Sequence, residues 1–417
     1  MRTRICLLAL LFFSIFSAKI FSQEDSVPQE NASENLSIVQ FNIDGLKRTK
    51  RSYMDGLLSH YLQKPASKET LKAIETTLQA QNLFDEIKVS ARPLDGTSAA
   101  VDISFKEKWT ILPMPFGYYT DGSYALGLFV MDMNALGQHC VAVAGGIYSP
   151  DKIIGAGVFS KPPAQKGKVG FSVAANASKG TNTFANAKNY AVFRYESFYA
   201  GLRGSILFKP TNSTSAKIGA GYSFMNPIDS PHVQRRNQWS VNASWGISKS
   251  NWNGFFLSAN SFSLGGELLF SDASAQRFAQ TLSFEGQVQQ PVVDRLRMMT
   301  VARGFLSHDL YATNYVGRSA SGLTLLPSSF ATDLIFGLFT GFEAAVIKAS
   351  FGIVSAYALM GLNLARDWNN SIYSCVGPEA GLRLYLAKIA FPAFAMGACY
   401  NINEKVWRFS FSGGASF

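Results

Sequence analysis

The sequence has few charged residues, and beyond its first residues it lacks an apolar run long enough for a membrane-spanning helix. Charged residues make up 16% of the 417 residues, whereas glycine occurs 35 times and phenylalanine 33 times. This composition is too aromatic and too poor in charge for a typical soluble enzyme. A transmembrane helix needs about 20 consecutive apolar residues. Sparse charge without such a helix favours membrane-spanning β-structure, whose outer side chains face lipid.

Motifs for catalysis and metal binding are also missing. The chain has no Gly-x-Ser-x-Gly elbow, no phosphate-binding loop and no His-Glu-x-x-His, and its four histidines are far apart. We therefore expect neither an enzyme nor a cofactor. Acidic residues in or beside apolar runs, such as Glu343 and Glu379, are interpreted as lining a lumen. The net charge of +10 could suit nucleic acid. However, the basic residues are scattered, so we expect no nucleic-acid partner and place them in loops, in the lumen and near anionic lipid headgroups.

The first residues have the pattern of a secretory signal peptide, over residues 1–22. Arg2 and Arg4 precede an apolar core that runs from Ile5 to Phe16. Residues 23–35 are polar and acidic, which is typical of a linker. The mature chain would keep three cysteines, an odd number, and each lies in a strand-like run. We interpret them as lone apolar residues rather than as a disulfide or a metal site.

Residues 36–107 predict a small α+β domain with the order β-α-α-β-β. The first helix is predicted to begin at a cap formed by Ser52 and the second to begin after Ser67, each with one apolar face. Asp95-Gly96 is a strong hairpin signal between the last two strands. The three predicted strands cover residues 36–43, 86–92 and 99–107.

Residues 108–417 predict an antiparallel barrel, because short alternating runs are separated by Gly, Asn, Pro, Ser and Asp. The fold class is therefore mainly β: a transmembrane barrel of about 16 strands preceded by one small α+β domain, since an even number returns both sheet ends to one side. The predicted strands are 124–133, 139–148, 153–160, 167–178, 188–197, 200–208, 215–225, 236–248, 254–266, 278–289, 295–306, 333–346, 349–361, 373–386, 389–401 and 405–417.

The last predicted strand shows the clearest alternation. Every second residue from Trp407 to Phe417 is aromatic or small, and the residues between them are polar or glycine. In a barrel the aromatic face would meet lipid. Gly413 and Gly414 pack poorly and weaken strand pairing. These glycines are compatible with a weak seam between this strand and the first predicted strand, Tyr124–Met133, which the family resemblance described next implies.

Residues 36–107 resemble a POTRA domain, and the stretch Asn82-Leu-Phe-Asp-Glu-Ile-Lys-Val89 is similar to that family's helix-to-strand signature. Such domains precede barrels in the BamA and TamA superfamily and in two-partner secretion transporters. The resemblance implies that an exposed strand edge binds unfolded clients by β-augmentation. Alternatively, a single copy only spaces or orients the barrel. By position, the edge consists of Glu86, Ile87, Lys88, Val89, Ser90, Ala91 and Arg92.

The resemblance also implies that the sixth external loop folds into the lumen and locks there through an Arg-Gly-aromatic motif. The longest predicted connection, Ser307–Thr332, has that position. Arg303 begins a matching tripeptide, but inside a predicted strand. Arg318 lies in the connection, although it does not directly precede Gly322. The final Phe417 resembles the aromatic signal by which outer-membrane barrels are recognised for insertion.

Together these features predict an outer-membrane protein of this superfamily that assists the insertion, assembly or translocation of polypeptides. The resemblance places the barrel in the outer membrane of a diderm bacterium and the small domain in the periplasm. The implied partners are unfolded outer-membrane or secreted polypeptides, membrane lipid and accessory lipoproteins. The alternatives are a passive pore, adhesin or surface-display scaffold with a vestigial domain, and a soluble β-rich secreted protein.

Overall fold

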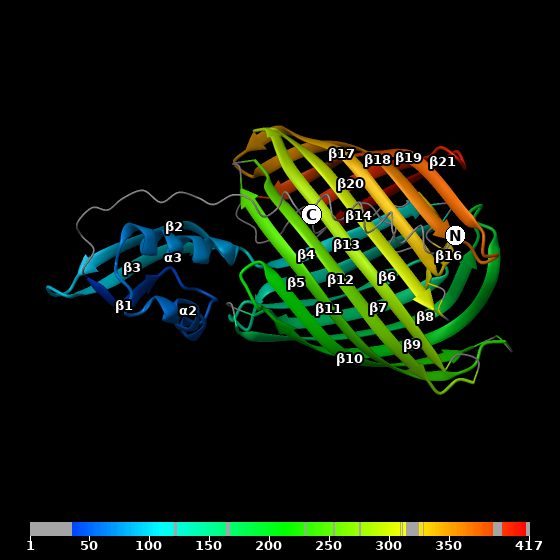
Figure 1. Cartoon of the computed structure of the whole chain (residues 1–417), viewed down its shortest axis with the longest axis horizontal. Helices are drawn as coiled ribbons and strands as arrows, with labels where there is room; N and C mark the ends of the chain where they lie inside the picture. The colour runs from blue at the N-terminus through cyan, green and yellow to red at the C-terminus, as the bar shows by residue number, and fades with distance from the viewer. Residues whose placement is uncertain are drawn as a thin grey trace.

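The computed structural model consists of a small N-terminal domain at one end of a closed β-barrel (Figure 1). Within the described residues, no helix is both long enough and apolar enough to cross a membrane. The predicted signal peptide and linker lie outside the described residues. The structure describes residues 36–120, 123–163, 167–228, 230, 232–252, 255–274, 277–308, 310, 312–313, 325–327, 329–386 and 394–413.

The N-terminal domain has the predicted order of elements. Its three-stranded sheet has the order β1-β3-β2, with β1 parallel and β2 antiparallel to β3. The helices bury Met54, Leu58, Ile74 and Leu78 in one core with the sheet. The elements are β1 (Ser37–Asp44), α2 (Arg51–Leu58), the 3-10 helix η1 (Ser59–Tyr61), α3 (Lys68–Ala80), β2 (Phe84–Pro93) and β3 (Ser98–Glu107).

One helix cap is confirmed and the other is wrong. The Ser67 side chain accepts a hydrogen bond from the Thr70 N–H and caps α3. The predicted cap of α2 at Ser52 is incorrect, because Lys50 occupies the cap position and makes no side-chain cap bond. The Lys50 N–H instead donates to the Gly137 carbonyl at 2.8 Å, so a contact with the barrel holds the start of this helix.

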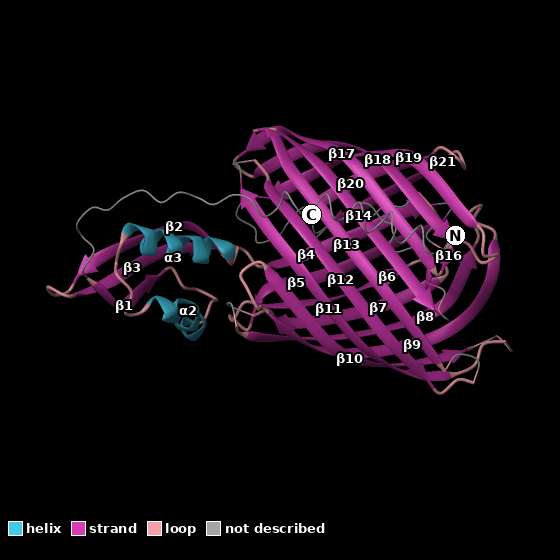
Figure 2. Ribbon diagram, viewed as in Figure 1, coloured by secondary structure: helices cyan, strands magenta, loops and turns pink. Residues whose placement is uncertain are grey.

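Sixteen strands close into one antiparallel barrel (Figure 2). Outside the barrel sheet, β15 (Ala312–Thr313) and β16 (Ala331–Thr332) form a separate pair. The barrel strands are β4 (Ile111–Thr120), β5 (Ser123–Ala135), β6 (Cys140–Tyr148), β7 (Lys152–Lys161), β8 (Val169–Ala185), β9 (Ala191–Phe208), β10 (Thr214–Pro227), β11 (Arg236–Trp252), β12 (Leu257–Ser271), β13 (Phe278–Val293), β14 (Leu296–His308), β17 (Leu334–Ala349), β18 (Gly352–Arg366), β19 (Ile372–Leu386), β20 (Phe394–Asn401) and β21 (Val406–Gly413).

The predicted number of barrel strands, sixteen, is confirmed, but only because two errors cancel: one strand was missed and another was predicted as two. No strand was predicted over β4, whose Pro113 and Pro115 are unusual in a strand interior. The predicted strands 188–197 and 200–208 are one strand, β9, which is longer than the 9–11 residues that cross a bilayer. If the first predicted strand runs outward from the N-terminal domain, every strand predicted before residue 200 therefore received the wrong direction. The predicted seam partner Tyr124–Met133 lies in β5, the second strand of the barrel rather than the first.

The outer and lumenal faces of the barrel follow the alternation of the sequence. In β21, Trp407 and Phe409 are about half exposed on the outer face, whereas Arg408 between them is buried. Trp239 and Val241 of β11 are likewise exposed. An apolar outer face is what lipid contact requires. The two-faced character predicted for the last strand is therefore confirmed over its described residues.

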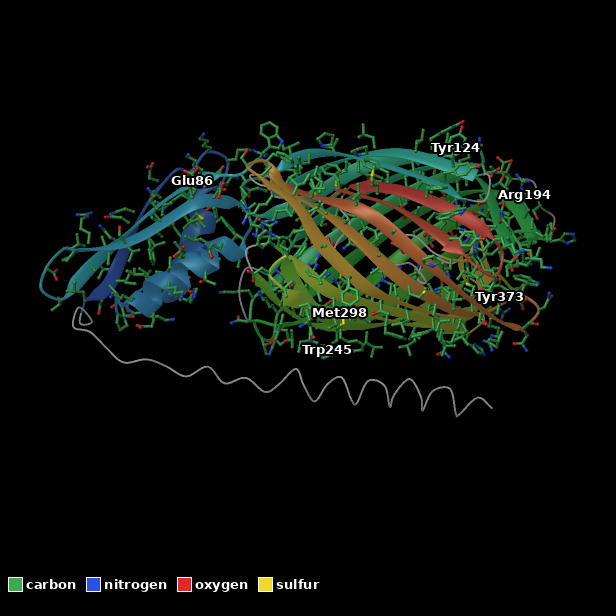
Figure 3. The ribbon with its side chains drawn as sticks, turned by 90° about the horizontal axis from the view of Figure 1, so that it is seen from above. Glu86, Tyr124, Arg194, Trp245, Met298 and Tyr373 are labelled. Carbon is green, nitrogen blue, oxygen red and sulfur yellow. The ribbon has the colours of Figure 1, made fainter. Side chains whose placement is uncertain are left out.

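The N-terminal domain lies at one end of the barrel and so distinguishes a near end from a far end. Figure 3 shows Tyr124, Arg194 and Tyr373 at the end far from the domain that contains Glu86. The described connections at the near end, such as residues 136–139 between β5 and β6, are short. The connection from β14 to β17 starts at the far end, as expected for the connection between the eleventh and twelfth predicted strands.

Candidate functional site

The β2 strand forms an open edge of the N-terminal sheet and contains the predicted edge, residues 86–92. Among the described residues it pairs on one side only, with β3. The opposite edge, β1, is partly covered. The Ile38 N–H donates to the Lys64 carbonyl at 2.9 Å, and the Ile38 carbonyl accepts from the Gln63 N–H at 2.8 Å. The open edge is therefore the one that the sequence indicated.

The ladder direction identifies the outward-facing backbone groups of β2. The Leu94 N–H donates to the Ser98 carbonyl at 2.9 Å, so the backbone groups of even-numbered residues in this register point towards β3. Those of Val89 and Ala91 point to the open side, while their side chains pack against the domain core. A bulge after Asp85 interrupts the register. Within the predicted seven-residue edge, only a short row of outward-facing backbone groups is therefore available for pairing with a partner strand.

The N-terminal domain is docked on the β5–β6 turn of the barrel. Arg48 forms a 2.9 Å ion pair with Asp132 of β5. The Asn134 side-chain amide donates to the Thr49 hydroxyl at 2.8 Å, and both residues are buried. Gly137 has a φ of +67°, and a Cβ there would lie only 2.2 Å from the Arg48 carbonyl oxygen. The turn therefore fits closely against the domain and requires glycine at this position.

A histidine and a glutamate with shifted pKa values, His139 and Glu107, lie at this interface. The Tyr53 hydroxyl and His139 Nδ1 are 3.1 Å apart, and burial lowers the pKa of His139. Burial raises the pKa of Glu107, but its carboxylate accepts from the backbone N–H groups of Arg48 and Thr49 at 2.8 and 2.9 Å. These hydrogen bonds outweigh burial and hold the pKa below its ordinary value. The interface thus favours a neutral imidazole and an ionised carboxylate.

The connection between β14 and β17 returns into the lumen, as the resemblance implied. Leu325, Leu326 and Phe330 are fully buried in a cluster with lumen-facing residues of the barrel wall, including Phe339 and Tyr357. Such packing displaces water from this part of the lumen. The segment therefore plugs the lumen on the side of β14 to β21.

Polar groups of the wall hold this segment by its backbone. The Leu325 carbonyl accepts from Arg408 Nη1 and from the Asn401 amide, both at 2.7 Å, and its N–H donates to the Asn363 side chain at 3.3 Å. Gly377 of β19 leaves room for the leucine, since a Cβ there would lie 3.0 Å from Leu325 Cδ2. In the described part, the arginine of this lock comes from the wall strand β21 and not from the loop.

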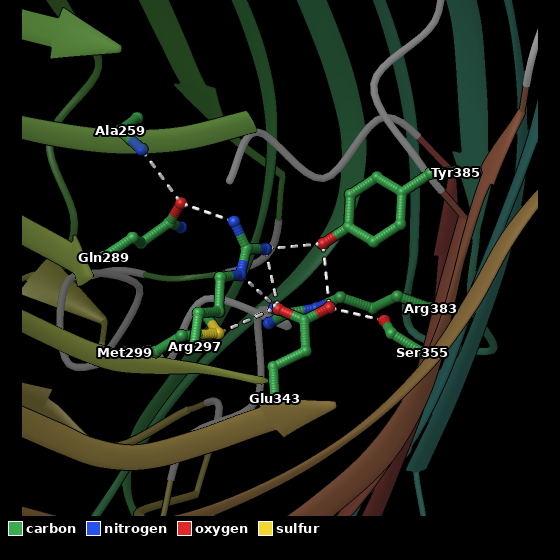
Figure 4. A network of polar contacts seen from close by, with 8 residues as sticks. All are labelled: Ala259, Gln289, Arg297, Met299, Glu343, Ser355, Arg383 and Tyr385. Carbon is green, nitrogen blue, oxygen red and sulfur yellow. Dashed lines mark hydrogen bonds and ion pairs between the residues drawn. The ribbon is translucent and has the colours of Figure 1, made fainter. Parts of the chain in front are cut away.

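A buried polar network around Glu343 joins six strands, β12 to β14 and β17 to β19, at the domain end of the lumen (Figure 4). Glu343 of β17 accepts from Arg297 Nη2 at 2.6 Å and from Arg383 Nη1 at 2.8 Å, and all three are at most 1% exposed. The Tyr385 hydroxyl donates to Glu343 at 2.8 Å, and Arg297 donates to Gln289 at 2.8 Å. Because buried ions are stable only when paired, this network fixes the register of β13 to β19.

Strand β21 closes the barrel against β4, which corrects the predicted seam. The described pairing is short, with Arg408–Ser412 opposite Phe116–Thr120, whereas β4 pairs with β5 along its whole length. The Thr110 carbonyl accepts from the Met133 N–H at 3.0 Å, so odd-numbered residues of β4 direct their backbone towards β21. Pro113 and Pro115 are odd-numbered and have no N–H to donate. The closing strand pair is therefore weak on the β4 side.

The other predicted site residues are only partly described. Arg318, Gly322, Gly414 and Phe417 lie outside the described residues. Gly413 ends β21 and pairs with Phe394. Arg303 lies in β14 and donates to Glu285 of the neighbouring strand at 2.9 Å, so it belongs to the wall and not to the connection. Cys140, Cys375 and Cys399 are free and buried, which confirms their interpretation as lone apolar residues.

Sequence reasoning placed several charged residues in the lumen but missed the partners that they bind there. Arg408 was placed on the polar face of the last strand, but its bond to the connection was not predicted. Glu343 and Glu379 were interpreted as lumen lining, and both are buried there. The available signal was a charged residue inside an apolar strand, which is costly unless it is paired. That signal identifies the residue but not its partner.

The comparisons with known proteins concern the fold alone. No family model matches the sequence, and no curated protein matches it. BamA from Haemophilus ducreyi lacking POTRA domains 1-3 is 12% identical, with a TM-score of 0.57 over 93% of this chain and 86% of that chain. CdiB from Acinetobacter baumannii is 12% identical, with a TM-score of 0.62 over 90% and 73%. CdiB from Escherichia coli is 12% identical, with a TM-score of 0.54 over 94% and 93%. This chain therefore has the fold of the BamA and CdiB outer-membrane β-barrels.

Proposed function

We propose that this chain is an outer-membrane protein that captures extended polypeptides and assists their insertion into, or translocation across, the outer membrane. The observation that carries the proposal is the open edge of β2 in a domain docked against the barrel. Val89 and Ala91 offer their backbone groups to a partner there. Backbone pairing tolerates many client sequences, which suits a protein that handles unfolded chains. The proposal assigns the chain no catalytic step and no cofactor.

The docked interface supports this use of the edge. A captured strand is useful only if it is held near the site where it will be used, and the contacts of Arg48 and Gly137 fix the domain at the barrel's near end. In this proposal the domain lies in the periplasm, its clients are outer-membrane or secreted polypeptides, and accessory lipoproteins assist it. The weak closing pair between β4 and β21 is where a client strand would meet the barrel and the lipid.

The lumen plug makes the passive pore a weaker alternative. Leu325 and Phe330 are fully buried against the wall, so steady conduction along this side of the lumen would require them to leave. An adhesin or display scaffold would need no open strand edge next to the barrel. The proposed function instead uses both features, with the edge for capture and the plug as a gate.

The test removes one outward-facing donor from the edge. Ala91→Pro deletes an N–H that points away from β3, so no hydrogen bond within the domain is lost. Ala91→Val keeps the donor and serves as the matched control. Each variant is expressed in cells depleted of the native protein, and outer-membrane and surface proteins are quantified. We expect Ala91→Val to restore their levels and Ala91→Pro to fail. Full restoration by a folded Ala91→Pro variant would refute capture at this edge.

A further inference from the structure

The lumen wall formed by β4 to β7 is apolar. Leu112 of β4 pairs with Met131, Met131 with Val143, and Val143 with Val158, so these side chains share one face. Leu112 is buried in a lumenal cluster, which identifies this face as the inner one. By the same register, the other side chains on this face of β5 to β7 include Phe129, Val141, Ile147, Ile154 and Ala156.

The outer face of the same strands is apolar as well. Leu126, Leu128 and Val130 of β5 are 59%, 55% and 48% exposed on that side. These strands therefore read as nearly continuous apolar runs, such as residues 125–131 and 141–147. Runs of this kind are typical of strands that are covered on both faces. A strand with lipid on one side and water on the other would alternate instead.

The neighbouring wall shows that alternation. In β8 to β11, the positions in register with the lumen face are mostly small and polar, or charged. They include Ser172, Asn176 and Ser178 of β8, Arg203 and Ser205 of β9, Lys217 and Ser223 of β10, and Ser240, Asn242 and Ser244 of β11. The lumen thus has a polar wall suited to water and, beside the seam, an apolar wall that is not.

The chemistry of the apolar wall selects its occupant. Strands β5, β6 and β7 are paired on both sides, so they offer no free ladder to a polypeptide. A polypeptide lying on them would leave its own backbone groups unpaired, at about 1–3 kcal/mol for each buried group. An acyl chain has no polar groups to satisfy. Val158 is still 39% exposed, so the described residues leave this part of the wall uncovered.

We propose that the apolar lumen wall of β4 to β7 binds the acyl chain of a membrane phospholipid, which enters through the seam between β4 and β21. The wall begins at β4, one of the two seam strands. Pro113 and Pro115 of β4 have no N–H groups to donate to β21, which weakens the pairing of these strands. Lipid from the bilayer can therefore reach the wall without crossing the polar side of the lumen. This inference needs no client polypeptide. It can fail while capture by β2 holds, and the reverse is also true.

The test places a tryptophan on the wall. Val158→Trp is made in the full chain and reconstituted in phosphatidylcholine vesicles whose acyl chains are brominated or unmodified, and the emission of the unsubstituted protein is subtracted. Bromine quenches tryptophan only on close contact. We expect a loss of emission comparable to that of Val130→Trp, which faces the bilayer. Asn176→Trp on the polar wall should keep its emission in brominated vesicles and lose it to aqueous iodide.

Each other result overturns the proposal. Quenching of Val158→Trp by iodide and not by bromine means that water covers the wall. Quenching by neither means that protein covers it. If the tryptophan prevents folding, as judged by heat-modifiable migration, Val143→Ser replaces it. Phospholipid that remains bound in detergent is then measured by native mass spectrometry. We expect less bound lipid than in the Val130→Ser control, and equal amounts would also refute the proposal.

Discussion

Truncating Leu325 should release the lumen plug. Its side chain is fully buried and lies against Gly361 and Gly377, where Cβ atoms would approach it to 3.1 and 3.0 Å. Leu325→Ala therefore leaves a cavity that no neighbour can fill, and such changes cost about 2–5 kcal/mol. The contacts are lost only in the docked state of the connection. The ratio of docked to released segments should then fall roughly 30-fold to several thousand-fold.

Planar-bilayer recording measures this shift directly. We expect the Leu325→Ala channel to spend a larger fraction of time in a high-conductance state than the native protein. Leu268→Ala is the matched control, because Leu268 is 43% exposed on the outer face and does not contact the plug. Unchanged conductance in a folded Leu325→Ala protein would show that the buried segment does not gate the lumen, and the reasoning from burial to gating would then be wrong.

Three further predictions concern the seam, the charge network and the docked interface. A disulfide between Tyr119→Cys and Phe409→Cys, which face each other across the seam, should abolish client insertion, and reduction should restore it; activity in the oxidised protein would exclude seam opening. Glu343→Gln leaves two buried arginines without a carboxylate and should lower the unfolding free energy by about 3–5 kcal/mol. Glu267 forms an ion pair with Arg203 that is more exposed, so Glu267→Gln should cost under about 1 kcal/mol in the same denaturant titration. Because burial lowers the pKa of His139, the undocked state takes up a proton first as the pH falls below about 6.5. Docking of the domain on the barrel should therefore weaken below this pH. Spin labels on the domain and on the barrel should then give a wider distance distribution, and His139→Asn should remove this pH dependence.

Local patterns in the sequence were sufficient to predict the faces of the last strand, one hairpin and one helix cap. The alternation of Trp407, Arg408 and Phe409 predicts which side chain faces lipid, because it depends only on neighbours along one strand. The hairpin at Asp95-Gly96 and the cap at Ser67 are local in the same way. Strand β4 was not predicted; it contains two prolines, which a seam strand tolerates and a central strand does not. The split of β9 arose because barrel strands extend beyond the bilayer.

The lumenal contacts could not be predicted, because they join distant residues. Arg408 and Leu325 are 83 positions apart, and Arg297 and Glu343 are 46 apart. A charged residue in an apolar strand signals that a partner exists. Only the register of the closed sheet and the path of the connection decide which partner it is. The same holds for His139, whose neighbour Tyr53 belongs to the other domain.

The sequence by itself determined a mainly β chain with a barrel of alternating strands, an aromatic outer face and a small domain of order β-α-α-β-β. These properties follow from periodicity and turn chemistry, which act over a few residues. The tertiary structure alone decided that β21 closes against β4, that the described part of the β14–β17 connection packs against one side of the lumen, and that the second apolar face of β5 to β7 points inward. Those outcomes depend on strand register and barrel closure, which are set by pairing across the whole chain.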